Sequence, residues 1–254
     1  MTNESWVRDR FDRAATTYEG AAVLQNREVD RIVERLLQMR PHYPVVWEIG
    51  CGTGRAGRRL LEADRVGTLH WNDLSEGMLA QAQAKLPETL RGKTTMLAGN
   101  AETLPWPTPV DLIFAGSVLQ WFRRPRIFFE KAHRALRPGG LAAFIAFGPD
   151  NCREIRALTG AGLSYPSEAA WTAMAAGFRI RHRESRTATL TFATPRAVLS
   201  HLRATGVTGT DPGFRWTTSR LKAFENTYRE AFPSPEGDGV ALTYHPIVMI
   251  LEKI

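Results

Sequence analysis

The chain has 254 residues, a formal net charge of +7 and 43% hydrophobic residues, an ordinary content for one globular domain spanning residues 1–254. No apolar run approaches the roughly 18 residues of a membrane helix, and the polar segment Met1–Arg13 lacks the apolar core of a signal peptide. These features argue against a membrane protein and predict a cytoplasmic one.

The hydrophobic pattern predicts an N-terminal helical segment followed by alternating strands and helices. Residues 1–44 form the helical segment, which we expect to fold over the ligand crevice. Its apolar side chains have helical spacing over residues 22–40, and Pro41 ends that helix. Strands are expected at 45–49, 68–73, 94–98, 110–116 and 140–147, and helices at 54–63, 75–85 and 125–137. This alternation predicts a Rossmann-like α/β fold, with a mostly parallel seven-stranded sheet, helices on both faces and a ligand crevice at the carboxyl ends of the strands.

The pattern changes after residue 148. A helix is expected within 169–177, strands at 178–183, 187–192 and 240–251, and a largely helical insert at 194–239. Within the insert, helices at 195–204 and 218–231 flank a turn at 205–210. We assign 45–193 and 240–254 to the core sheet. We expect the insert to form a lid over the crevice, because it lies between the last two strands.

The first predicted strand leads into a glycine-rich turn, VVWEIGCGTG over residues 45–54. Glycines at alternate positions let the backbone turn sharply and approach a ligand, and the following helix directs free N–H groups toward it. A dinucleotide fingerprint would need glycine where the chain has Arg55, and a P-loop would need Gly-Lys-Ser/Thr in place of Gly54-Arg55-Ala56. Glu48 suits a cofactor that carries an ammonium group and would repel a pyrophosphate. The loop therefore favours S-adenosylmethionine over NAD, FAD, ATP and GTP.

A second acid supports this choice. Asp73 ends the second predicted strand, 19 residues after Gly54, where a carboxylate can accept hydrogen bonds from two ribose hydroxyls. Leu74 follows it directly, and Met78 lies early in the next helix, where it can pack against an adenine. Asp73, Leu74 and Met78 are therefore predicted to contact the nucleoside part of the cofactor.

Five segments, in order and at their spacing, resemble the class I S-adenosylmethionine-dependent methyltransferases from residue 45 to about residue 147. They are VVWEIGCGTG, NDLSEGML, GNAETLPW, DLIFAGSVLQWF and ALRPGGLAAFIAF. The resemblance implies that the loop holds the methionine part, Asp73 the ribose and the GNAE segment the adenine. The cofactor residues are then Glu48, Gly50, Cys51, Gly52, Gly54, Asp73, Leu74, Met78, Asn100, Ala101, Glu102 and Ser117. The family often has aspartate where this chain has Asn100, whose amide can still hydrogen-bond the adenine edge.

The positive charge comes from arginines spread along the chain, at 55, 58, 59, 123, 124, 126, 179, 181 and 183 among others. They can attract an acidic protein. Aromatic residues are not interleaved with them as a base-stacking surface would require, so we expect no nucleic-acid partner. The two cysteines, Cys51 and Cys152, suggest neither a disulfide framework nor a metal site.

Four further segments resemble the malonyl-acyl-carrier-protein O-methyltransferases of biotin synthesis, and this resemblance covers nearly the whole chain. They are FDRAATTYEGAAVLQ, VLQWF, HLRATGVTGT and ALTYH. The resemblance implies methyl transfer to the free carboxylate of a malonyl thioester on an acidic carrier protein or coenzyme A. The candidate acceptor-binding residues are Tyr18, Gln120, Trp121, His201, Arg203 and Tyr244. Because this carboxylate is already ionised at neutral pH, we expect positioning and no catalytic base.

Three alternatives stay open. A methyltransferase of the same fold could act on another small carboxylic acid or a quinone-type acceptor. A carbon or nitrogen acceptor usually needs a proton removed, and a histidine such as His201 would then be a general base. A non-catalytic protein could bind S-adenosylmethionine without turnover. An RNA-binding methyltransferase would show steep salt dependence with nucleic acid. The sequence leaves the oligomeric state and the acyl chain length open.

Overall fold

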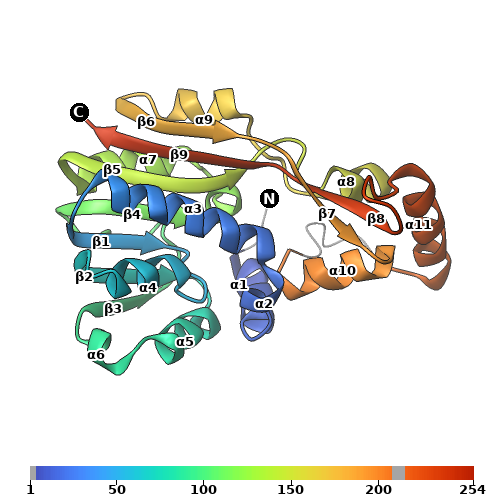
Figure 1. The fold of residues 1–254 in the computed structure, drawn as a ribbon, viewed down its shortest axis with the longest axis horizontal. Helices are drawn as coiled ribbons and strands as arrows, with labels where there is room; N and C mark the ends of the chain where they lie inside the picture. Colours follow the sequence, from blue (N-terminus) through green and yellow to red (C-terminus); the bar gives the residue numbers. More distant parts are fainter. Residues whose placement is uncertain (1–3, 208–214) are drawn as a thin grey trace.

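The computed structural model describes residues 4–207 and 215–254. Its core is a seven-stranded sheet in the order β3-β2-β1-β4-β5-β9-β6 (Figure 1). The main-sheet strands are β1 (Tyr43–Ile49), β2 (Val66–Asp73), β3 (Thr94–Ala98), β4 (Val110–Gly116), β5 (Leu136–Phe147), β6 (Phe178–Ser185) and β9 (Pro246–Lys253). β9 runs antiparallel to both of its neighbours, and the other pairs are parallel. The predicted mostly parallel α/β sheet is confirmed.

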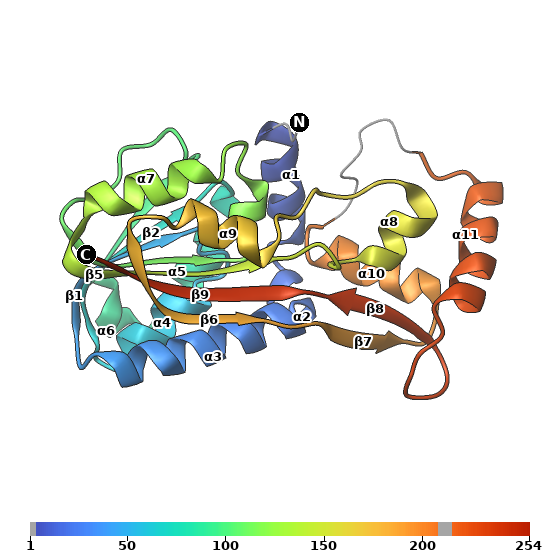
Figure 2. The same ribbon diagram turned by 90° about the horizontal axis from the view of Figure 1, so that it is seen from above.

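Helices cover both faces of this sheet, as Figure 2 shows. They are α3 (Val23–Met39), α4 (Arg55–Glu62) and α5 (Glu76–Lys85) on one face, and α7 (Arg126–Ala135) and α9 (Glu168–Met174) on the other. Trp71 and Leu60 belong to the apolar cluster on the first face, and Trp47 and Phe128 to the cluster on the second. The central strands are therefore buried on both sides, which accounts for their nearly continuous apolar sequences.

The segment predicted as one final strand is two strands. β8 (Val240–Tyr244) and β9 meet at His245, and β8 pairs with β7 (Ala188–Phe192) in a separate two-stranded sheet. Residues 188–192 and 240–244 therefore do not belong to the main sheet, contrary to expectation. α8 (Arg153–Thr159), which follows β5, packs on β8 there, and buried Glu154 accepts hydrogen bonds from the Thr243 backbone N–H and hydroxyl.

The two-stranded sheet extends away from the main sheet and carries the insert helices α10 (Pro195–Ala204) and α11 (Thr218–Ala231) (Figures 1 and 2). Thr194 and Thr217 cap these helices by accepting hydrogen bonds from the backbone N–H groups of Ala197 and Arg220. Tyr228 and Leu242 are buried in the apolar cluster between these helices and the two-stranded sheet. The expected turn at 205–210 lies partly outside the described residues.

The remaining elements are short, except for the first helix. They are α1 (Glu4–Ala14), α2 (Tyr18–Ala21), α6 (Glu88–Arg91) and the 3-10 helix η1 (Leu119–Trp121). α1 packs against α5 beside the carboxyl ends of the strands. None of the helices in the described part of the chain is long and apolar enough to cross a membrane.

Candidate active site

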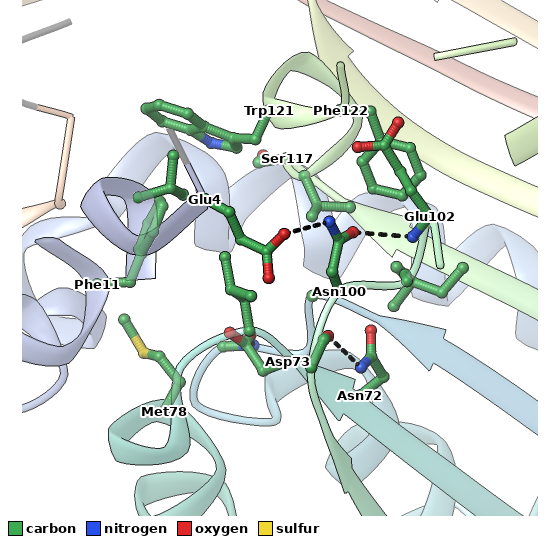
Figure 3. Close-up of a pocket in the computed structure, with 18 of the residues that line it drawn as sticks. Glu4, Phe11, Asn72, Asp73, Met78, Asn100, Glu102, Ser117, Trp121 and Phe122 are labelled. Atoms are coloured by element: carbon green, nitrogen blue, oxygen red, sulfur yellow. Dashed lines mark hydrogen bonds between the residues drawn. The ribbon is translucent and has the colours of Figure 1, made fainter. Parts of the chain in front are cut away.

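A cavity lies at the carboxyl ends of β1, β2 and β4, where the strand order reverses on either side of β1. This is the expected ligand position in such a sheet. Its wall includes the glycine loop, the tips of β2 and β4, and one face of α1. Figure 3 shows Glu4, Asp73, Asn100 and Trp121 around the space that they enclose.

The glycine loop requires its glycines. Gly50, Gly52 and Gly54 have φ angles of +59°, +55° and +77°, a region that side chains disfavour. A Cβ on Gly50 would lie 2.5 Å from Cγ2 of Val118. Gly50 and Gly52 line the cavity, whereas Cys51 and Gly54 are not among its described lining residues. Cys51 instead fixes the loop to β2, because its backbone N–H donates to the carbonyl of Asn72.

Glu48 does not line the cavity formed by the described residues, contrary to expectation. Its carboxylate is buried behind the loop, where Oε2 accepts hydrogen bonds from Trp71 Nε1 at 2.7 Å and the Gly57 backbone N–H at 2.9 Å. Burial is the main cause that raises the pKa of Glu48 to about 8. Glu48 therefore fastens β1 to β2 and α4 and does not provide a carboxylate at the cavity surface.

Asp73 does reach the cavity. Its two oxygens accept hydrogen bonds from the backbone N–H groups of Gly52 at 2.8 Å and Ser75 at 2.9 Å. Burial raises the pKa of Asp73 to about 6, although these backbone bonds oppose the increase. Leu74 and Met78 line the same wall, so the structure brings together the three residues predicted to contact the nucleoside.

The segment after β3 uses its polar side chains to hold neighbouring segments. Asn100 Oδ1 accepts a hydrogen bond from the Glu102 backbone N–H at 2.9 Å, and its Nδ2 donates to Glu4 Oε2 at 2.8 Å (Figure 3). The Glu102 carboxylate accepts from the backbone N–H groups of Arg123 and Arg124. Asn100, Ala101 and Glu102 all line the cavity, as predicted from the resemblance.

The segment after β4 forms the opposite wall. Ser117, with a φ of +58°, lines the cavity, and its buried Oγ has no hydrogen-bond partner among the described residues. Gln120 donates from Nε2 to the Ser117 carbonyl at 2.6 Å, and Gln120 itself is not among the described lining residues. An unpartnered buried hydroxyl in a cavity wall is typical of a polar ligand site.

Tyr18 and Trp121 form an aromatic wall with Phe11. The Phe11 ring meets Trp121 edge to face at 5.5 Å between centroids and Tyr18 at 6.3 Å. Burial, followed by the charge of Asp73, raises the pKa of Tyr18 to about 12. Its hydroxyl therefore stays protonated at neutral pH and can donate a hydrogen bond.

The N-terminal helical segment lies over the cavity, as expected, but the sequence did not indicate which residues of α1 line it. Glu4, Val7 and Phe11 line it, and their spacing places them on one face of the helix. The apolar spacing of Val7, Phe11 and Ala14 was the available signal. By contrast, the described residues of the 194–239 insert do not line this cavity, so of the two expected covers only the N-terminal segment borders it.

The other acceptor candidates lie elsewhere. His201 Nε2 is 2.7 Å from the Tyr244 hydroxyl, and burial lowers the pKa of His201. Neither residue is among the described residues that line the cavity at the strand ends. Arg203 lines a second cavity of about 390 Å³, together with Arg10, Arg156 and apolar residues of α8, α10 and α11.

The first cavity suits a cationic nucleoside ligand. Among its described lining residues, the charged ones are Glu4, Asp73, Glu102 and Arg123, so acids outnumber bases. The positive-φ glycine loop presents backbone to the space, and the Ser117 hydroxyl lacks a protein partner. These residues fit S-adenosylmethionine, whose sulfonium and ammonium groups are positive and which carries no phosphate.

The strand order and this cavity define a class I methyltransferase. A family model described as a methyltransferase domain matches residues 47–142. The chain is 38% identical to the malonyl-[acyl-carrier protein] O-methyltransferase of Bacteroides helcogenes, in an alignment covering 97% of each protein. It belongs to the malonyl-[acyl-carrier protein] O-methyltransferase family and is an S-adenosylmethionine-dependent O-methyltransferase.

Solved structures share the fold at low identity. A candidate methyltransferase of Bacillus halodurans matches with a TM-score of 0.65 and 17% identity, covering 87% of this chain and 98% of that one. The N-methyltransferase NodS of Bradyrhizobium japonicum, solved with S-adenosyl-L-homocysteine, matches with a TM-score of 0.56 and 14% identity, covering 89% and 86%.

Proposed function

We propose that this enzyme methylates the free carboxylate of a malonyl thioester on acyl carrier protein, an early step of biotin synthesis in the cytoplasm. The observation that carries this proposal is the composition of the cavity wall. Its acids suit the cationic cofactor, while the aromatic group Phe11, Tyr18 and Trp121 borders the remaining space, and the described lining residues include no histidine, lysine or cysteine. Such a site suits an acceptor that is already ionised and needs no base.

The cofactor residues divide into those that line the cavity and those that support it. Gly50, Gly52, Asp73 and Ser117 would hold the methionine and ribose parts, and the wall with Leu74, Met78 and Ala101 would enclose the adenine. Glu48, Cys51 and Gly54 keep the loop in shape. When bound, S-adenosylmethionine supplies a methyl group on a positively charged sulfur.

The protein contributes mainly orientation and the exclusion of water. Tyr18 donates a hydrogen bond toward the acceptor carboxylate, and Trp121 and Phe11 close the apolar side. Gln120 acts through the Ser117 backbone and holds η1 in place. Positioning of this kind lowers barriers by about 7–11 kcal/mol in favourable cases, and removal of water exposes a carboxylate whose charge is neutralised on methylation.

We assign the second cavity to the arm that carries the thioester. Both cavities border α1, since Arg10 lines the second and the adjacent Phe11 lines the first. The apolar wall of the second cavity suits the long arm that bears the thioester. Its three arginines suit the phosphate that joins this arm to an acidic carrier protein. The insert then covers the acceptor arm, and His201 and Tyr244 support α10 against β8.

Mass measurement of the intact carrier tests the proposal. Malonyl carrier protein, incubated with enzyme and S-adenosylmethionine, is expected to gain one methyl group that mild ester hydrolysis removes. Unmodified acyl carrier protein, which lacks the malonyl carboxylate, is the matched control. A methyl group that resists hydrolysis, or equal labelling of the control, would show that the acceptor is a different group. Parallel reactions with malonyl coenzyme A decide which carrier is used.

A further inference from the structure

The amide of Asn100 presents a donor to the cofactor cavity. Its Oδ1 faces the Glu102 backbone N–H at 2.9 Å, which orients Nδ2 toward Glu4. The backbone carbonyl of Asn100 accepts from the N–H groups of Thr103 and Leu104, so the whole residue is held in a turn. The exocyclic amino group of an adenine is also a donor. Nδ2 therefore cannot accept its hydrogen, and another acceptor must serve this edge of the cavity.

Glu4 provides such an acceptor. It lines the cavity, and its carboxylate points into the space between Asn100 and Asp73 (Figure 3). One oxygen, Oε2, accepts from Asn100 Nδ2 at 2.8 Å. An ionised carboxylate can accept about four hydrogen bonds. The bond to Asn100 thus orients Glu4 and leaves capacity for a ligand.

A second contact holds α1 in register beside the same wall. Asp12 Oδ1 accepts hydrogen bonds from the Ser75 hydroxyl at 2.5 Å and the Gly77 backbone N–H at 3.1 Å. Glu4 and Asp12 are eight positions apart and therefore lie on the same side of the helix. α1 is fastened at one end to the segment after β3 and at the other to the start of α5.

We propose that Glu4 accepts the hydrogen bond from the exocyclic amino group of the cofactor's adenine, with Asn100 as its positioning residue. This inference rests on the proposed S-adenosylmethionine site. It also explains the amide at position 100. An aspartate there would place a second carboxylate within hydrogen-bond distance of Glu4, and the two charges would repel each other. In this chain Glu4 of α1 provides the carboxylate, and Asn100, which follows β3, donates a hydrogen bond to it.

Binding of two ligands that differ only at the base tests the proposal. S-inosylhomocysteine carries an oxygen where S-adenosylhomocysteine carries the amino group. Calorimetry on the full chain measures the ratio of their dissociation constants. Wild type is expected to prefer the adenine ligand. Glu4→Gln keeps the shape and replaces one acceptor with a donor, so this preference is expected to fall by about tenfold or more.

Two further variants sharpen the result. Asp9→Asn changes the charge of α1 equally at an exposed position outside the described cavity wall, and it is expected to keep the wild-type preference. The double variant Glu4→Gln, Asn100→Asp returns a carboxylate to this edge of the cavity and is expected to restore the preference for the adenine ligand.

Two outcomes would overturn the assignment of Glu4. One is a wild-type preference in Glu4→Gln, and the other is an equal loss for both ligands, which would reduce Glu4 to a contact that holds α1. Failure of wild type to bind either ligand would instead overturn the proposed function, and this inference with it.

Discussion

The carboxylate of Glu48 and the indole of Trp71 share a buried hydrogen bond of 2.7 Å between adjacent strands β1 and β2. The same oxygen accepts the backbone N–H of Gly57 in α4. A Cβ on Gly57 would come within 2.5 Å of this oxygen, so the helix can approach only because residue 57 is glycine. Glu48 thus stabilises the glycine loop from the buried side, through β2 and α4.

This relationship predicts an unusual pH dependence of stability. Burial raises the pKa of Glu48 from 4.5 to about 8, so the folded state binds this proton more tightly than the unfolded state. The stabilisation is fully present below pH 4.5 and is lost as the pH rises through about 8. In urea unfolding between pH 5 and 8, wild type is expected to lose stability relative to Glu48→Gln, which mimics the neutral acid. Parallel pH profiles for the two proteins would contradict this assignment.

Asp73 predicts a pH dependence of cofactor affinity. Burial raises its pKa to about 6, and its charged form is the better acceptor for ribose hydroxyls and the better partner for a cation. The dissociation constant of S-adenosylmethionine is expected to fall as the pH rises from 5 to 7. Asp73→Asn should flatten this profile. Asp73→Ala should weaken binding about 100-fold, as expected for two hydrogen bonds to a charged group. Calorimetry that finds unchanged binding in Asp73→Ala would remove Asp73 from the site.

The glycine loop predicts a sharp contrast between two glycine substitutions. Gly50→Ala places a Cβ against Val118 in a backbone with positive φ, which is expected to cost about 1–3 kcal/mol of unfolding free energy and to impair cofactor binding. Gly20→Ala lies in α2, where the added Cβ meets nothing within 4 Å. It is expected to be neutral or to stabilise by about 0.5–1 kcal/mol. Chemical denaturation with parallel calorimetry checks both, and equal behaviour would refute the strain argument.

The second cavity predicts a separation of acceptor binding from cofactor binding. Arg203→Ala is expected to raise KM for malonyl carrier protein about 3- to 10-fold, with little change in kcat or in cofactor affinity, and the effect should shrink as salt is added. Arg196→Ala, on the same helix but paired with Glu225, is the matched control. Steady-state kinetics that show the same KM change for both variants would exclude a specific role of Arg203.

Local patterns were sufficient for much of this molecule. The helix and strand order through residue 147, the glycine loop and Asp73 all follow from short-range features: hydrophobic period, backbone freedom of glycine and an acid at a strand tip. Each of these is encoded within a few neighbouring residues. The wall with Leu74, Met78 and Ala101 follows from the same local order, because parallel strands bring their carboxyl ends to one edge.

Contacts between distant segments settled the rest. Whether Glu48 faces a ligand or the protein interior depends on Trp71 and Gly57. β8 pairs with β7 and contacts α8, so it leaves the main sheet that β9 enters. An N-terminal segment over the crevice was expected, but its exact seat depends on the contacts of Glu4 with Asn100 and of Asp12 with Ser75, far along the chain. Such contacts depend on tertiary packing. Local sequence patterns do not specify which side chains from distant segments will contact each other.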